Sequence, residues 1–200
     1  MNMNDDRLKD ISEIRSMMER SSKFLSLSGL AGVSAGTVAL LGAAAAYQQL
    51  KNNENLAERN NLFSFFILDA GIVLFLALAL AIFFTTRMAK KKGLPIWSKT
   101  TKYMLTSLCV PLIVGGLFCF ILWYHGLVML IAPATLIFYG LALLNTSSYT
   151  LIEVRYLALA EIFLGLLAAL LLDSWLVLWA IGFGALHIVY GTFMYMKYEK

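Results

Sequence analysis

The chain has 200 residues, of which 60% are hydrophobic and 14% are charged, whereas about 25% of an ordinary soluble domain is charged. Its formal net charge is +4 and it contains two cysteines. These values exclude a disordered chain, a disulfide-stapled secreted domain and a soluble nucleic-acid-binding protein. They indicate a protein that is surrounded by lipid and has no nucleic acid among its partners.

The first segment, residues 1–23, is the most polar part of the chain. Residues 5–23 read DDRLKDISEIRSMMERSSK, in which five acidic residues balance five basic ones. Apolar residues such as Leu8, Ile11 and Met18 recur at helical spacing, so we predict an amphipathic helix on the cytoplasmic face. Its zero net charge argues against purely electrostatic attachment to lipid. The helix could lie on the membrane, dock on the cytoplasmic loops or bind a cytoplasmic partner protein.

Residues 24–200 are interpreted as a transmembrane domain. A helix needs roughly 20 apolar residues to cross the hydrocarbon core. Six runs meet or approach this length: 24–47, 62–84, 103–123, 127–144, 154–172 and 175–195. The runs are continuous rather than alternating, which argues against a β-barrel. We therefore predict an all-α bundle of six transmembrane helices, arranged as three antiparallel hairpins.

Small residues form two rows on the first of these helices. Ser28, Gly32 and Gly36 are spaced by four residues, and alanines between positions 31 and 43 form the adjacent row. Small residues allow helices in lipid to approach closely. We therefore predict that this helix packs on at least two sides, near the centre of the bundle. The same spacing also fits the contact face of a homodimer.

Basic residues are distributed unevenly between the two sets of loops. Of the 16 Lys and Arg residues, only Lys51 and Arg59 lie in the loops that would face outward. The remainder precede the first run, follow the last, open the fifth or lie between the second and third. The positive-inside rule then places both termini in the cytoplasm.

Three adjacent basic residues, Lys90, Lys91 and Lys92, follow the second run. Their simplest interpretation is charge that sets the topology. They could also contact the headgroups of anionic lipids. Membrane lipids are therefore expected partners, and Trp97 in the same loop fits an interfacial anchor under either interpretation.

Asp69 is an ionisable residue inside the second run. If the first hairpin is centred near Asn53, Asp69 lies roughly opposite Thr37, and a hydrogen bond between the two is expected. The alternative is that Asp69 lines an aqueous cleft open to the outside. His125 lies at an outer turn, away from His187, which argues against a bis-histidine haem. The sequence also shows no metal cluster, phosphate-binding loop or Ser-His-Asp set, so we expect no metal and no cofactor.

Glu161 and His187 are the most specific feature of the sequence. Each lies 13 residues from Ser174, at the apex of the last hairpin, so an antiparallel pair places them at the same depth. Rows of small residues, including Gly165 and Gly184, would bring the two backbones close. A charge-bearing group at membrane depth is costly and by default marks a functional site.

This pair has two interpretations. It could be a polar clasp that fixes the register of two helices. It could instead bind protons, since histidine beside a carboxylate changes its charge near physiological pH, or anchor a lipid-like or small ligand. Tyr190 lies one turn from His187 and could extend the network.

The stretches EIRSMMERSSKFLSLSGLAG and GFGALHIVYGTFMYMKYEK resemble segments of an uncharacterised family of small six-helix bacterial membrane proteins. The resemblance covers the whole chain. It implies the predicted topology and a location in the bacterial inner membrane, and it implies no catalytic residue.

The function that these observations favour is non-enzymatic binding or sensing. Glu161, His187, Tyr190 and Asp69 are the candidate residues for binding a ligand or protons. A small proton-coupled secondary transporter is the alternative hypothesis. A membrane enzyme that acts on lipid is a weaker third, because the sequence supplies neither a nucleophile nor a metal site for it.

Overall fold

The computed structural model describes residues 27–52 and 59–200. Within these ranges the chain forms helices and no strand, which confirms the predicted all-α class. The helices are α2 (Gly29–Asn52), α3 (Arg59–Lys91), α4 (Lys99–Tyr124), α5 (Ile131–Thr146), α6 (Glu153–Leu170), α7 (Trp175–Trp179) and α8 (His187–Tyr198). A π-helical segment, η5 (Ala180–Leu186), joins α7 to α8 in one continuous helix. The amphipathic helix predicted for residues 1–23 lies outside the described residues.

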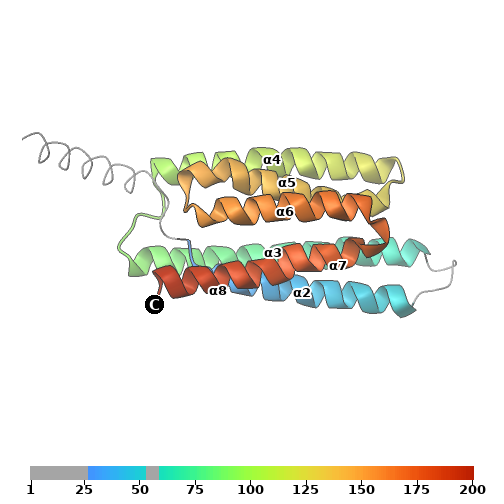
Figure 1. Ribbon diagram of the computed structural model, residues 1–200, viewed down its shortest axis with the longest axis horizontal. Coiled ribbons are helices and arrows are strands. Elements are labelled where there is room, and N and C mark those ends of the chain that lie inside the picture. Colours follow the sequence, from blue (N-terminus) through green and yellow to red (C-terminus); the bar gives the residue numbers. More distant parts are fainter. Residues whose placement is uncertain (1–26, 53–58) are drawn as a thin grey trace, which may run out of the picture.

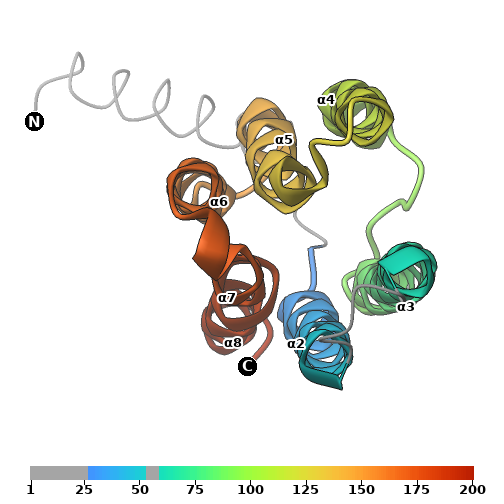
Figure 2. The ribbon, with the colours of Figure 1, turned by 90° about the vertical axis from the view of Figure 1, so that its right-hand side faces the viewer.

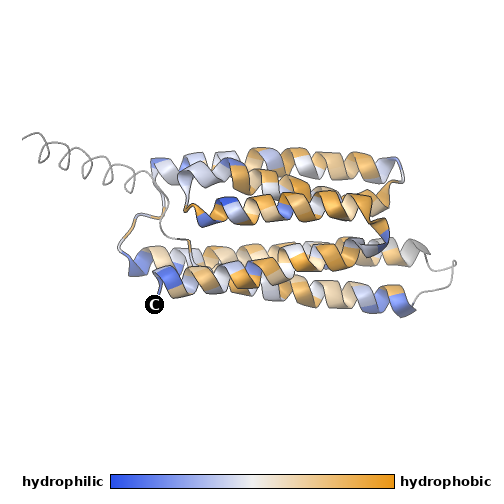
Figure 3. Cartoon of the chain, in the orientation of Figure 1, coloured by the Kyte–Doolittle hydropathy of each residue, from blue (hydrophilic) through white to orange (hydrophobic). Residues whose placement is uncertain are grey.

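Five helical segments in the described part of the chain are long and apolar enough to cross a membrane. They are Gly29–Asn52, Ser64–Lys91, Lys99–Tyr124, Val128–Tyr149 and Leu172–Tyr198. Helix α6 differs from them because its 18 residues include Glu153, Arg155 and Glu161. Figure 3 shows hydrophobic residues dominating the middle of the bundle and hydrophilic ones gathering towards its ends.

Several helices extend beyond the apolar runs from which they were predicted. Helix α3 continues to Lys91, where Gly93 with φ of +63° follows it. Helix α4 begins at Lys99 because Ser98 caps it: the Ser98 side chain accepts the backbone N–H of Thr101 at 3.1 Å. Backbone hydrogen bonding and capping decide where a helix ends, so hydropathy alone places the boundaries several residues short.

The helices form two layers of three (Figures 1 and 2). One layer contains α4, α5 and α6, with α5 in the middle, and the other contains α3, α2 and the continuous α7–α8 helix, with α2 in the middle. The layers meet where α7 and η5 contact α5 and α6. The helices run alternately up and down, so the start of α2 and the end of α8 lie at the same end of the bundle.

Helix α2 packs through its glycines, as the small-residue rows predict. A Cβ atom added at Gly191 of α8 would lie 2.5 Å from the Gly29 oxygen, and one at Gly36 would lie 2.6 Å from the Gly184 oxygen. On another side, a Cβ at Gly42 would overlap a methyl group of Val73 in α3. The prediction that this helix packs on two sides is therefore confirmed. Because Gly36 faces η5 of the same chain, and Gly32 likewise faces α8, a homodimer would need another face.

We expect Gly191→Ala to destabilise the fold, because the new methyl group would meet backbone atoms of α2. Overpacking of this kind costs about 1–3 kcal/mol. Gly116→Ala is the matched control, since nothing lies within 4 Å of a Cβ added there; it should leave stability unchanged or raise it by up to about 1 kcal/mol. Unfolding in detergent, followed by circular dichroism, measures both. Equal stability of the two variants would contradict close α2–α8 packing.

Candidate functional site

Glu161 of α6 and His187 of α8 meet between the two layers, as their equal spacing from Ser174 predicts. His187 Nδ1 lies 3.4 Å from Glu161 Oε1. The exposed fraction of Glu161 is 0% and that of His187 is 6%. The predicted contact is confirmed, and it places a carboxyl group and an imidazole side by side away from solvent.

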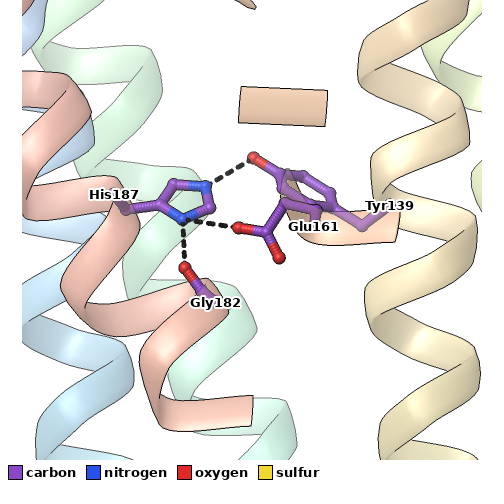
Figure 4. Close-up of polar contacts among 4 residues, drawn as sticks. All are labelled: Tyr139, Glu161, Gly182 and His187. Carbon is purple, nitrogen blue, oxygen red and sulfur yellow. Dashed lines mark hydrogen bonds and ion pairs between the residues drawn. The ribbon is translucent and has the colours of Figure 1, made fainter. Parts of the chain in front are cut away.

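Both ring nitrogens of His187 have a polar neighbour (Figure 4). Nδ1 lies 3.0 Å from the carbonyl oxygen of Gly182, and Nε2 lies 2.8 Å from the hydroxyl of Tyr139 in α5. A backbone carbonyl can only accept a hydrogen bond, so Nδ1 carries a proton and donates it. In the neutral ring Nε2 then accepts the hydroxyl proton of Tyr139. The two contacts fix both the tautomer and the orientation of the ring.

Gly182 shapes the site through its backbone and through its missing side chain. It lies in the π-helical segment η5, a type of irregularity that is frequent at functional sites. The backbone N–H of His187 donates to Gly184, while the ring Nδ1 contacts the Gly182 carbonyl. A Cβ at Gly182 would lie 2.7 Å from Glu161 Oε2 and 2.6 Å from a methyl carbon of Leu136. Glycine at this position therefore makes room for the carboxyl group.

The Glu161 carboxyl group is the most unusual element of the site. Both of its oxygens are buried and neither accepts a hydrogen bond from any described residue, since the 3.4 Å contact with His187 lacks hydrogen-bond geometry. Leu136 and Ala158, which are both fully buried, lie in the same region of the core. An ionised carboxylate in such surroundings is costly. The environment therefore favours a site without a net charge.

Aromatic rings enclose the imidazole on the side of the α6–α7 turn. Phe183 stacks near the His187 ring with a centroid distance of 6.0 Å, and Trp179 lies 4.9 Å from Phe183. The Trp179 indole N–H donates to the hydroxyl of Thr135 in α5 at 3.2 Å. These rings separate the polar groups from the Ser174 end of the bundle.

Two of the candidate residues do not join this cluster by hydrogen bonds. The Tyr190 hydroxyl, which could have extended the network, is buried but has no partner among the described residues, and Tyr139 contacts the ring instead. Asp69 faces Gly42 at the α2–α3 interface. The Thr37 hydroxyl donates to the carbonyl of Val33 at 2.8 Å instead of to Asp69, as helical threonines commonly do.

The small-residue rows also pack differently from the prediction. Gly165 of α6 faces Ile137 in α5, and Gly184 of η5 faces Leu40 in α2. These two glycines therefore pack within their own layers rather than bringing α6 against α8, whereas Ala168 of α6 shares a core cluster with Leu178 of α7.

A second polar cluster closes the end of the bundle where the chain terminates. Glu153 Oε1 accepts hydrogen bonds from Lys197 at 2.5 Å and from the Tyr198 hydroxyl at 2.8 Å. Glu199 accepts the backbone N–H of Gly29 and, at 3.4 Å, the Ser28 hydroxyl. The side chains of Lys90, Lys91 and Lys92 are exposed at this same end. Among the described residues, charge is thus concentrated at this end of the bundle.

Tyr139 and Gly182 were not expected from the sequence. The sequence does contain a signal for Tyr139. Tyr139 lies 12 residues before Leu151, at the α5–α6 turn, and Glu161 lies 10 residues after Leu151. The same counting that paired Glu161 with His187 would have brought Tyr139 near them. Gly182 had no such signal, because its position depends on the π-helical register of η5.

No family model, curated protein or solved structure matches this chain. The role of the site is therefore argued from its own geometry.

We expect Tyr139→Phe to destabilise the protein by about 1–3 kcal/mol, because it leaves the buried Nε2 of His187 without a partner. Tyr156→Phe on α6 is the matched control, since Tyr156 is 69% exposed and should tolerate the loss of its hydroxyl. Unfolding in detergent measures both. If Tyr139→Phe behaves like the control, the Tyr139–His187 hydrogen bond does not stabilise the fold.

Proposed function

We propose that the chain is an integral protein of the bacterial inner membrane with six spanning helices and both termini in the cytoplasm. Five apolar helices support this, together with the position of α6 between two of them in the chain. The distribution of charge supports the orientation, since Lys91 and Lys197 lie at the end where the chain terminates and Lys51 lies at the other. The charges of α6 are compatible with a spanning helix: Glu153 and Arg155 lie in its first turn, and Glu161 lies in the buried contact with His187.

Single-cysteine labelling tests this topology, including the crossing by α6. In a chain whose native cysteines at 109 and 119 are replaced by alanine, Lys51→Cys and Asp173→Cys should react with a membrane-impermeant maleimide in right-side-out spheroplasts. Lys91→Cys should react only after lysis. All three native side chains are exposed. Protection of Asp173→Cys before lysis would show that α6 does not cross.

The function that we propose for the site is reversible proton binding by a non-enzymatic sensing protein. The observation that carries it is the fully buried Glu161 carboxyl group, which lies beside His187 without a hydrogen bond. With Glu161 as the neutral acid and His187 as the neutral imidazole, the site has no net charge. Losing or gaining one proton then creates a charge in a medium where charges interact strongly.

A change of charge at this site would act on the contact between the layers. If Glu161 ionises, the Nδ1–H of His187 is drawn from the Gly182 carbonyl towards the carboxylate. If His187 gains a proton, Nε2 becomes a donor and the Tyr139 hydroxyl must turn to accept from it. Either step alters how α6 and α5 hold the α7–α8 helix, which is the kind of two-state element that a sensor requires.

The close packing supports protons over a larger ligand. A Cβ at Gly182 would meet both Leu136 and the Glu161 carboxyl group, so little space remains on that side of Glu161. The transporter hypothesis would need polar groups leading from Asp69 to the site, and Asp69 lies against α2 instead. A sensing role, unlike a transporter, requires no polar path from Asp69 to the site, so it accounts for the geometry more simply.

Infrared difference spectroscopy on the purified protein tests proton binding. We expect a carbonyl-stretch band from a protonated carboxylic acid whose intensity changes with pH, and we expect Glu161→Gln to remove it. Asp173→Asn, at an exposed turn, should leave the band in place. Circular dichroism confirms that each variant is folded. A band of constant intensity over the range in which the protein stays folded would make the pair a structural clasp alone.

A further inference from the structure

Positive charge collects around the loop that joins α3 to α4. Lys90 and Lys91 end α3, with Arg87 one turn before them, and Lys99 and Lys102 open α4. These five residues form a basic cluster, and their side chains are exposed. Arg87 lies three and four residues before the lysines of α3, and the lysines of α4 are three residues apart. Residues at these spacings share a face of a helix, so each helix presents one basic face at this end of the bundle.

The described chain supplies no anion for the basic cluster. None of the ion pairs between described residues includes its side chains, and the single acid of α3 and α4 is Asp69, in the other half of α3. At this end of the bundle, Glu153 binds Lys197, and Glu199 accepts the backbone N–H of Gly29. Residues 5–23 contain as many basic as acidic residues, so they bring no net negative charge. The cluster is therefore suited to an anion from outside the chain.

Each basic face continues along its helix into an exposed apolar stripe. The stripe on α3 lies 4, 11 and 15 residues before Arg87, and the stripe on α4 lies 8, 11 and 15 residues after Lys102, so each follows one side of its helix. The stripes consist of Ile72, Leu76 and Phe83 on α3, and of Val110, Ile113 and Leu117 on α4. Basic ends that lead into long apolar stripes match a molecule with an anionic head and apolar chains.

No other helix covers α3 and α4 between these ends. Helix α3 packs on α2 and α4 packs on α5. Among the described residues, α3 and α4 do not pack along each other, and Figure 2 shows them in different layers, joined by their loop. Nothing lies within 4 Å of a Cβ added at Gly71 or Gly116, one on each helix. The apolar stripes are therefore left to the lipid around the protein.

The loop itself carries apolar side chains between the two basic faces. Its ends are held by hydrogen bonds: the Leu94 N–H donates to the Ala89 carbonyl at 3.0 Å, and the Ser98 side chain caps α4. Trp97 is 68% exposed and Ile96 is 39% exposed. An exposed tryptophan is typical of the membrane–water interface, which is the level of the lipid headgroups.

We propose that the ends of α3 and α4 bind an anionic phospholipid, with its headgroup on the basic cluster and its acyl chains along the apolar stripes. Clustered basic residues beside a spanning helix attract anionic lipids through charge complementarity. The proposal rests on the membrane location proposed above. It is independent of proton binding by Glu161, which lies in the buried contact between α6 and α8.

Native mass spectrometry of the purified full-length chain in detergent tests this surface. Dioleoylphosphatidylglycerol, which is anionic, and dioleoylphosphatidylcholine, which has no net charge, are titrated separately, and each dissociation constant is measured. We expect the wild type to bind phosphatidylglycerol more tightly. Lys99→Gln/Lys102→Gln should raise its dissociation constant about 25-fold, because each basic residue contributes about a factor of five. The dissociation constant of phosphatidylcholine should not change.

The matched control removes two charges from the same end of the bundle without touching the basic cluster. Arg155 of α6 and Lys200 are exposed, so Arg155→Gln/Lys200→Gln should bind phosphatidylglycerol like the wild type. Circular dichroism confirms that both double variants are folded. Equal weakening in the two double variants would reduce the effect to net charge and overturn the assigned surface.

Two further probes separate a phospholipid from a simpler anion. Inorganic phosphate should not displace dioleoylphosphatidylglycerol, and dihexanoylphosphatidylglycerol, whose chains are short, should bind more weakly because it covers less of the apolar stripes. Displacement by phosphate would show an anion site that does not recognise lipid. Equal affinity of the wild type for the two dioleoyl lipids would overturn the proposal and leave the basic cluster with topology as its role, whatever the infrared experiment shows for Glu161.

Discussion

The arrangement of the two helical layers depends on the contact between Glu161 and His187. Hydrocarbon provides no hydrophobic force between helices, so helices in lipid associate through close packing and polar contacts. Glu161 belongs to the layer of α5 and α6, and His187 belongs to the layer of α2 and α8. Neither side chain tolerates hydrocarbon alone. The buried position of each side chain therefore depends on contact with the other layer, and this contact holds the two layers together.

Polar contacts join the layers at three levels along the bundle. Trp179 donates to Thr135 near the α6–α7 turn, His187 contacts Tyr139 and Glu161 in the middle, and Lys197 with Tyr198 binds Glu153 at the far end. Glycine contacts act within a layer instead, as between Gly36 and Gly184 or between Gly165 and Ile137. These glycines set distances inside each layer, whereas Gly182 and the polar groups set how one layer lies on the other.

The sequence predicts the helices and the central pair well, because both follow from regularities of the chain. Apolar runs identify helices, and equal spacing from Ser174 brings Glu161 to His187 as long as the two helices are antiparallel. It predicts the surroundings of the pair poorly. Which of Tyr139 and Tyr190 contacts the imidazole depends on the rotation of each helix, and η5 changes that rotation by its π-helical turn. Counting residues determines depth in a bundle, whereas helix rotation is decided by packing.

The polar groups are also arranged asymmetrically along the bundle axis, and this bears on the choice between sensor and transporter. On the side of Ser174, Phe183 stacks near the imidazole, Trp179 packs at a tilt against Phe183, and Leu136 lies beside Gly182. On the opposite side, Tyr190 and Glu153 carry buried atoms without partners in the described chain. A transporter must open its site alternately to both sides of the membrane, whereas a sensor needs equilibrium with one side. Polar groups leading towards a single end fit the sensor, and in the proposed orientation the pH that it follows is that of the cytoplasm.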